Sequence, residues 1–260
     1  MAFDLNSISR SGAKKLPPRM VIHGPHGIGK TTFASEAPKP VFIPTEDGLV
    51  GVEVDAFPMA TEYSQVKSAL NAIVDSDYQT IVIDSADWLE ALIHNHTAKE
   101  NGKENIESFG YGKGYVLALS HWRELLKILD WYRSEKNMTI IFLSHSEIKR
   151  FDSPETDSFD RYFIKLHKAA SALLLEWADV VGFANWMVLT KESDTGFGHK
   201  RVRGLGNGQR ILHLEERPSH IAKSRFPLPQ QISLTWEAFE DALQKSRNPE
   251  TEDNNNGTTA

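Results

Sequence analysis

Short apolar runs alternate with amphipathic stretches along most of the chain. The apolar runs predict strands at residues 20–23, 41–44, 80–84, 138–143, 180–189 and 210–214. Helices are predicted at 30–37, 116–133, 168–178 and 235–245, the second of them from apolar residues at three- and four-residue spacing. Strands that alternate with helices indicate an α/β fold, a mostly parallel sheet with helices on both faces. A turn at 194–199 adds an antiparallel hairpin near the C-terminus.

Composition and the segments outside this pattern suggest the domain boundaries. We expect residues 1–18, which are polar and basic, to form an N-terminal arm, 19–247 to form one folded domain, and 248–260 to be a disordered tail. With 40% hydrophobic residues and no cysteine, the chain can bury a core but cannot form disulfides or thiolate metal sites. It has neither a membrane-length apolar run nor a signal-peptide pattern, so a cytoplasmic protein without a membrane partner is expected.

A glycine-rich loop follows the first predicted strand. Residues 24–31 read Gly-Pro-His-Gly-Ile-Gly-Lys-Thr, which satisfies the P-loop pattern for phosphate binding. Glycines let the backbone wrap the phosphates, Lys30 should reach the β- and γ-phosphates, and the Thr31 hydroxyl should bind Mg²⁺. The sequence therefore predicts a site for ATP and Mg²⁺, with these contacts to the nucleotide: Gly24, Pro25, His26, Gly27, Ile28, Gly29, Lys30, Thr31 and Thr32.

Two carboxylates follow predicted strands at the sheet edge where the P-loop should lie. Asp84 ends a fully apolar strand and should hold Mg²⁺ and the nucleotide, as a Walker B aspartate does, although a helix N-cap is the alternative. Glu46 follows the second strand and is placed to deprotonate the attacking water. The alternative for Glu46 is an ordinary loop acid, and Asp47 competes with it for the role of base.

Together these motifs resemble the RecA-type recombinase core, a P-loop ATPase. Residues 42–49, Phe-Ile-Pro-Thr-Glu-Asp-Gly-Leu, are similar to the strand that ends in the family's catalytic glutamate, which implies this role for Glu46. Residues 81–85 resemble its Walker B strand. Residues 142–145, Phe-Leu-Ser-His, resemble the strand whose final glutamine senses the γ-phosphate, a position that His145 takes here.

A further segment bears on assembly. Residues 222–227, Ala-Lys-Ser-Arg-Phe-Pro, resemble the RecA segment whose two basic residues reach the ATP of the neighbouring subunit. The resemblance implies that Lys223 and Arg225 act in trans, so that the chain assembles with itself into a filament or ring. From the residues alone, two solvated surface cations are the alternative.

Two polar segments are candidates for contact with single-stranded DNA. Residues 99–115 set aromatic side chains on a glycine-rich backbone, where they could stack on bases. Residues 146–168, which we expect to be a loop, follow His145 directly and mix basic with acidic residues. The net charge of −6 excludes a uniformly basic DNA-binding protein but not a local patch. Packing onto the domain is the alternative for both segments, whose candidates are Phe109, Tyr111, Lys113, Tyr115, Lys149, Arg150, Arg161, Lys165 and Lys168.

Over residues 19–230 the chain also resembles small RecA-like ATPases of bacteriophages, the Sak-four single-strand annealing group. The segments that carry this likeness are 109–115, 160–162, 165–168 and 176–179. It implies ATP-dependent annealing or exchange of strands, beside a single-strand-binding protein. A P-loop motor or loader, or a nucleotide-gated adaptor with a protein partner, are the rival functions. His94 and His96 lie two residues apart and so cannot share a helix face, and we expect surface positions rather than metal ligands.

Overall fold

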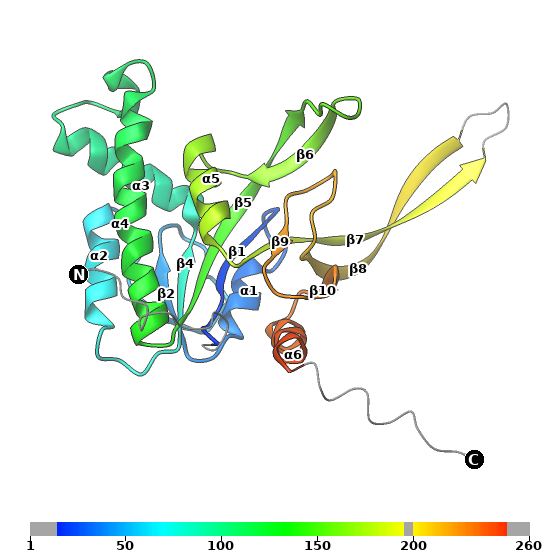
Figure 1. Ribbon diagram of the computed structural model, residues 1–260, viewed down its shortest axis with the longest axis horizontal. Coiled ribbons are helices and arrows are strands. Elements are labelled where there is room, and N and C mark those ends of the chain that lie inside the picture. The colour runs from blue at the N-terminus through cyan, green and yellow to red at the C-terminus, as the bar shows by residue number, and fades with distance from the viewer. Residues whose placement is uncertain (1–14, 195–199, 249–260) are drawn as a thin grey trace, which may run out of the picture.

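The computed structural model describes residues 15–194 and 200–248, in which ten strands form one sheet. The main path of the sheet runs β10-β8-β7-β1-β5-β4-β2-β3, with β6 beside β5 and β9 beside β7 (Figure 1). The strands are β1 (Arg19–Gly24), β2 (Pro40–Pro44), β3 (Asp55–Ala56), β4 (Thr80–Asp84), β5 (Thr139–Phe151), β6 (Phe159–Ile164), β7 (Val180–Asp194), β8 (Lys200–His213), β9 (Lys223–Ser224) and β10 (Gln231–Ser233). The pairs from β7 to β3 along this path are parallel, and the other pairs are antiparallel.

Helices cover both faces of the sheet. They are α1 (Lys30–Ser35), α2 (Tyr63–Ala72), α3 (Ala86–Glu100), α4 (Lys113–Glu135), α5 (Lys168–Trp177) and α6 (Trp236–Arg247), with a short 3₁₀ helix, η2 (Ile106–Phe109). Because side chains alternate along a strand, Val21 of β1 packs in the core under α2 to α5, whereas Met20 and Ile22 pack in the core under α1 and α6. The predicted fold class, a mostly parallel sheet between two helical layers with C-terminal antiparallel strands, is confirmed.

Several elements differ from the sequence-based expectation: β7 extends to Asp194, and α2 and α3 were not among the predicted helices. The strand expected to end at 143 continues as β5 to Phe151 and pairs with β6 in an antiparallel hairpin, so most of 146–168 is not a loop. The strand expected at 210–214 is the end of a longer β8, which pairs with β7. Most of the predicted turn at 194–199 lies outside the described residues, as do the predicted tail beyond residue 248 and the arm up to residue 14.

The described end of the expected arm packs on the domain. The Lys15 ammonium donates to the Arg247 carbonyl oxygen at 3.0 Å, and Arg133 donates to the Pro17 carbonyl oxygen at 2.7 Å. Residues 15–18 thus bridge α6 and α4 at the amino edge of the sheet. None of the described helices combines the length and apolar character that a membrane crossing requires.

Candidate functional site

The P-loop lies at the carboxyl edge of the sheet, between the end of β1 and the start of α1. A Cβ atom on Gly24 would lie 2.3 Å from the carbonyl oxygen of Ala184 on β7, so a larger residue would force the strands apart. Gly29 has a φ of 104°, in the left-handed region that glycine adopts without strain. Both glycines are therefore needed by the backbone path itself.

The remaining loop residues divide between the core and the surface. Ile28 is 0% exposed and packs in the core beneath α1 and α6, which fixes the loop on the domain. Pro25 is half-buried, while His26, Gly27 and Thr32 face solvent. The exposed side of the loop is thus the side open to a ligand.

Lys30 is a buried cation at the mouth of the loop. Its side chain donates to the carbonyl oxygens of Gly24 and Pro25, both at 3.0 Å, and the residue is 7% exposed. Burial lowers the pKa of Lys30, and nearby carboxylates, of which Asp84 is the strongest, oppose that shift. A buried ammonium held only by neutral carbonyls is well suited to an anionic ligand such as a phosphate.

Asp84 and Thr31 meet next to this cation. The Thr31 hydroxyl donates to Oδ2 of Asp84 at 2.9 Å, and Asp84 is 5% exposed. Burial raises the pKa of Asp84, while the hydrogen bond from Thr31 opposes the rise. A hydroxyl and a carboxylate side by side at a phosphate loop are hard oxygen ligands of the kind that Mg²⁺ prefers, so this pair fits the ion.

His145 is held at the same edge by a residue that the sequence reasoning missed. The pairing of β1 with β5 sets Gly24 opposite His145. Asp87, in the first turn of α3, accepts both the His145 backbone N–H at 3.1 Å and its Nδ1 at 2.9 Å, and the His26 ring stacks on the other side, 4.0 Å between centroids. Burial raises the pKa of Asp87, but the hydrogen bonds from His145 outweigh it and bring the pKa to about 2. A stable carboxylate thus fixes the orientation of the imidazole.

Glu46, rather than Asp47, faces this group. The Glu46 carboxylate lies 3.9 Å from Nδ1 of His145, and its side chain is 19% exposed, whereas Asp47 is exposed. A Cβ atom on Gly48 would lie 3.7 Å from Cγ of Glu46 and 4.0 Å from Oδ2 of Asp84, which places both carboxylates around one point. The structure therefore brings Glu46, Lys30, Thr31, Asp84 and His145 together from four separate segments.

Arg210 of β8 reaches the P-loop from the side opposite His145. Its guanidinium donates to the Ile28 carbonyl oxygen at 3.4 Å and lies 5.8 Å from the Trp186 ring centroid. A Cβ atom on Gly29 would lie 2.5 Å from Nη1 of Arg210, so the arginine side chain packs directly against this glycine. No local motif marks Arg210, because only the β7–β8 pairing brings it to the loop.

Lys223 and Arg225 do not belong to the P-loop of their own subunit. Arg225 lies at the amino edge of the sheet, where Nη1 donates to Asp179 at 2.9 Å and the side chain is 49% exposed. Asp179 also pairs with Arg19 and Arg133, both at 2.9 Å, so three arginines share one buried carboxylate. Lys223 is half-buried in β9, and burial lowers its pKa.

The first candidate DNA segment is divided between exposed and packed side chains. Tyr111 is fully exposed and Lys113 is exposed, while Phe109 is half-buried. Tyr115 lies in α4 and stacks flat on His167, with centroids 4.1 Å apart and an angle of 3° between the rings. Of the four candidates in this segment, Tyr111 and Lys113 thus face solvent, whereas Tyr115 packs on the domain.

Arg161 is in a different environment from the one that the sequence suggested. It is 7% exposed, its guanidinium donates to Glu216 and to the His220 carbonyl oxygen, and it lies 5.3 Å from the Phe151 ring centroid. The prediction that Arg161 contacts DNA directly is therefore wrong, because the side chain is buried. The reason is that β6 turns this side chain inward, where the cation supports the hairpin.

The other basic residues of the second segment remain on the surface. Lys149 and Arg150 are exposed on β5, paired with Glu147 at 2.6 Å and Asp160 at 3.6 Å. A cleft of about 430 Å³ leads from Asp87 to this hairpin and is lined by Asp87, Trp88, Glu90, Glu147, Lys149, Lys165 and Leu166. Lys165 in the cleft wall and Lys168 at the start of α5 are both exposed. The cleft thus extends from Asp87, which holds His145, to the β5–β6 hairpin that carries Lys149.

Glu90, in this cleft wall, should make stability pH-dependent. It is 8% exposed, accepts the His167 backbone N–H at 2.9 Å, and burial raises its pKa from 4.5 to about 7. A raised pKa in the folded state favours folding below pH 4.5, and this contribution is lost as pH rises through about 7. Relative to Glu90→Gln, the wild type should lose up to about 1.4 kcal/mol of stability per pH unit across this window.

Urea denaturation of both proteins between pH 4.5 and 8 measures this difference. Glu53→Gln, which changes an exposed carboxylate, should follow the wild type at every pH. A constant difference between Glu90→Gln and the wild type over the whole range would contradict the assignment.

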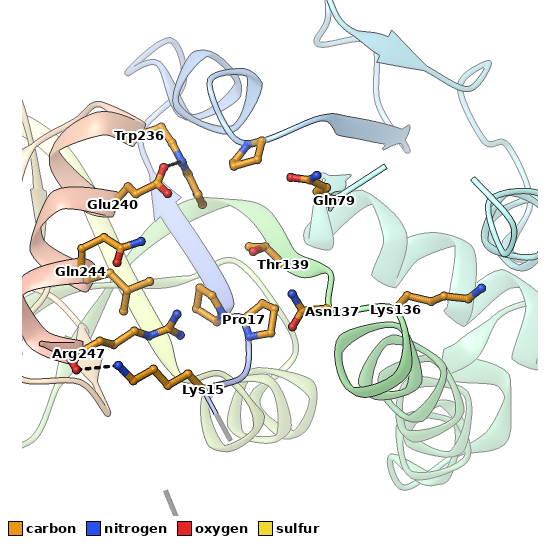
Figure 2. Close-up of a pocket in the computed structure, with 13 residues that line it drawn as sticks. Lys15, Pro17, Gln79, Lys136, Asn137, Thr139, Trp236, Glu240, Gln244 and Arg247 are labelled. Atoms are coloured by element: carbon orange, nitrogen blue, oxygen red, sulfur yellow. Dashed lines mark hydrogen bonds between the residues drawn. The ribbon is translucent and has the colours of Figure 1, made fainter. Parts of the chain in front are cut away.

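A separate cavity of about 390 Å³ opens at the amino edge of the sheet, away from the P-loop. Figure 2 shows its wall: α6 contributes Trp236, Glu240, Gln244 and Arg247, and Gln79 and Thr139 stand at the beginnings of β4 and β5. Lys15 closes one side by its bond to Arg247. Phosphate-binding residues of the P-loop type lie at the other end of these strands, so this cavity is not the nucleotide site.

The fold and the glycine-rich loop together define a P-loop domain of the nucleotide-binding class. A family model described as AAA domain, AAA_24, matches residues 16–226. The chain belongs to this AAA domain family.

Two further proteins are similar to this chain. The SPbeta prophage-derived uncharacterized protein YorG of Bacillus subtilis (strain 168) is 22% identical over 229 residues, which are 82% of this chain and 61% of YorG. The chain therefore spans less than two thirds of that relative. A crystal structure of the RadB recombinase aligns with 86% of this chain and 90% of its own, at 14% identity and a TM-score of 0.46.

Proposed function

We propose that this protein is a phage-type recombination ATPase of the RecA-like, Sak-four kind, which binds single-stranded DNA in an ATP-dependent way and promotes strand annealing or exchange. The prophage origin of YorG supports a phage connection. Residues 19–247 would form the ATPase domain. A single-strand-binding protein would be a partner of the DNA complex rather than of the ATPase site.

The site residues divide the work of hydrolysis. Lys30 and the backbone of the P-loop would bind the phosphates, and Glu46 would take a proton from the attacking water. Thr31 and Asp84 would hold Mg²⁺, which when bound neutralises charge on the phosphates. His145, fixed by Asp87, would report the state of the γ-phosphate.

One observation supports coupling to DNA above all others. The same strand, β5, carries His145 at the site and Lys149 and Arg150 on the hairpin. A shift of His145 on ATP binding would therefore be transmitted along a continuous hydrogen-bonded strand rather than through a flexible loop. The exposed Tyr111 and Lys113 would add stacking and charge beside it, with Lys165 and Lys168 flanking the hairpin.

Lys149→Ala should weaken the binding of an oligodeoxynucleotide in the presence of a non-hydrolysable ATP analogue. Loss of one phosphate contact lowers the slope of log affinity against log salt by about 0.7 for single strands. Fluorescence anisotropy over a salt series measures this slope.

Lys39→Ala is a matched control for Lys149→Ala. Each lysine forms an ion pair with a carboxylate, and the two side chains are equally exposed, 54% for Lys149 and 55% for Lys39. Lys39, however, lies just before β2 and pairs with Asp77, away from the hairpin. The Lys39 variant should keep the wild-type slope. Equal slopes for the Lys149 variant and the wild type would argue against the hairpin as a DNA contact.

Assembly would complete the site, because Lys223 and Arg225 are remote from their own P-loop. We expect Lys30→Ala and Arg225→Ala to be inactive separately and to recover activity when mixed. In a random one-to-one oligomer about a quarter of the interfaces pair an intact P-loop with an intact Arg225. ATPase assays over a range of mixing ratios test this, and failure to recover activity at every ratio would rule out the trans role.

A further inference from the structure

Three potential metal ligands meet between α3 and α4, far from the P-loop. His96 and Glu100 lie one turn apart on α3, and His121 faces them from α4. From the sequence, His96 was expected to be a surface residue because His94, two residues away, cannot share its helix face. The partners in the fold are instead a carboxylate four residues later and a histidine 25 residues later, which the packing of α3 against α4 brings together.

The distances suit a single small cation. One ligand atom from each residue lies within 4.8 Å of the other two, and Nε2 of His121 is already 3.1 Å from Oε2 of Glu100. Ligands about 2.1 Å from a tetrahedral zinc ion are about 3.4 Å apart. The Glu100 side chain is 58% exposed, so it can rotate to close the remaining gap.

The two imidazoles are already positioned by their surroundings. The Tyr63 ring of α2 lies behind both, with centroids 5.3 Å from His96 and 5.8 Å from His121, and its hydroxyl donates to the His121 carbonyl oxygen at 3.0 Å. With Nε2 of His121 turned to Glu100, its Nδ1 lies 3.9 Å from the Glu124 carboxylate. A carboxylate on the far ring nitrogen is the outer-shell arrangement that orients a metal-binding histidine.

His96 is chemically ready to be a ligand. Its ring is packed edge-to-face on His121, 4.9 Å between centroids, and no hydrogen bond joins it to another described residue. A ring nitrogen of His96 is therefore available to a metal ion.

We propose that His96, Glu100 and His121 bind one divalent cation of the zinc class, with a fourth position open to water. Two imidazoles and one carboxylate form a donor set that suits Zn²⁺ and, as probes, Co²⁺ and Ni²⁺, rather than Mg²⁺ or Ca²⁺. The ion would fasten α3 to α4 at the base of the connection that carries Tyr111. This site is independent of ATP and DNA binding, so it stands whether or not the proposed function holds.

Titration of Co²⁺ and Zn²⁺ into the nucleotide-free full-length protein tests the site. We expect one equivalent to bind, with the visible absorption of a four- or five-coordinate Co²⁺ that Zn²⁺ displaces. His96→Gln, His121→Gln and Glu100→Gln should each weaken binding at least about 10-fold. Because Glu100 is exposed, its variant tests the ligand set without disturbing the core.

Two controls separate this site from adventitious binding. His94→Gln changes a histidine that lies against Tyr115, 5.2 Å between centroids, and Glu104→Gln changes an exposed carboxylate beyond α3. Both should bind Co²⁺ as the wild type does. Failure to bind a stoichiometric ion, or binding that survives all three ligand substitutions, would overturn the proposal and leave Glu100 and His121 as a simple ion pair.

Discussion

Replacing Lys30 with alanine is expected to reduce steady-state ATP hydrolysis at least about 100-fold, as loss of a principal charge-stabilising group in a reaction site does. Lys30 is 7% exposed and bonded only to carbonyl oxygens, so its charge is available to the phosphates at low solvent screening. Nucleotide affinity should fall as well, since the same ammonium contacts the ground state. Equilibrium binding of a fluorescent ATP analogue and phosphate release measure the two effects.

Lys39→Ala provides the control for this substitution. Lys39 is an exposed lysine near the start of β2, at the opposite edge of the sheet, and its removal should leave both affinity and rate at wild-type values. If Lys30→Ala retained more than a tenth of the wild-type rate, the P-loop would not be the hydrolytic site.

Glu46→Gln should separate binding from chemistry. A general base contributes roughly 10²- to 10⁴-fold to rate, whereas the amide keeps the size and hydrogen-bonding shape of the side chain. Because Glu46 lies beside His145 and Asp84 rather than in the P-loop, ATP affinity should stay near the wild-type value while the maximal rate falls. Single-turnover hydrolysis with saturating protein isolates that chemical step.

Asp47→Asn is the matched substitution one residue along. Asp47 is exposed, so the change should leave the rate close to that of the wild type. A large loss in Asp47→Asn together with an active Glu46→Gln would transfer the role of base to Asp47. A loss of ATP affinity in Glu46→Gln would instead make Glu46 a binding residue.

The features that the sequence predicted well are those written in consecutive residues. The P-loop needs Gly24 and Gly29 at fixed positions, and the apolar strand before Asp84 is buried throughout, so both are visible as local patterns. Parallel strands end at the same edge of the sheet, and from that rule we expected Asp84 and Glu46 to lie beside the P-loop.

The features that the sequence missed depend on contacts between distant segments. Asp87 holds His145 from 58 residues away, and Arg210 reaches Ile28 from 182 residues away, so no local spacing reveals either. The β5–β6 hairpin was expected to be a loop, since the extension of β5 over residues 146–151 is mostly polar. The metal cluster depends on how α3 packs against α4. Tertiary pairing, rather than intrinsic propensity, decides these positions.

The most direct test of an ATPase that works on single-stranded DNA is steady-state ATP hydrolysis with no polymer, with single-stranded DNA and with duplex DNA, using Lys30→Ala as the blank. We predict hydrolysis that depends on Lys30 and is strongly stimulated by single strands but not by duplex. Lys30-dependent hydrolysis that is the same under all three conditions would contradict the DNA-coupled account and indicate a motor or adaptor with a protein partner.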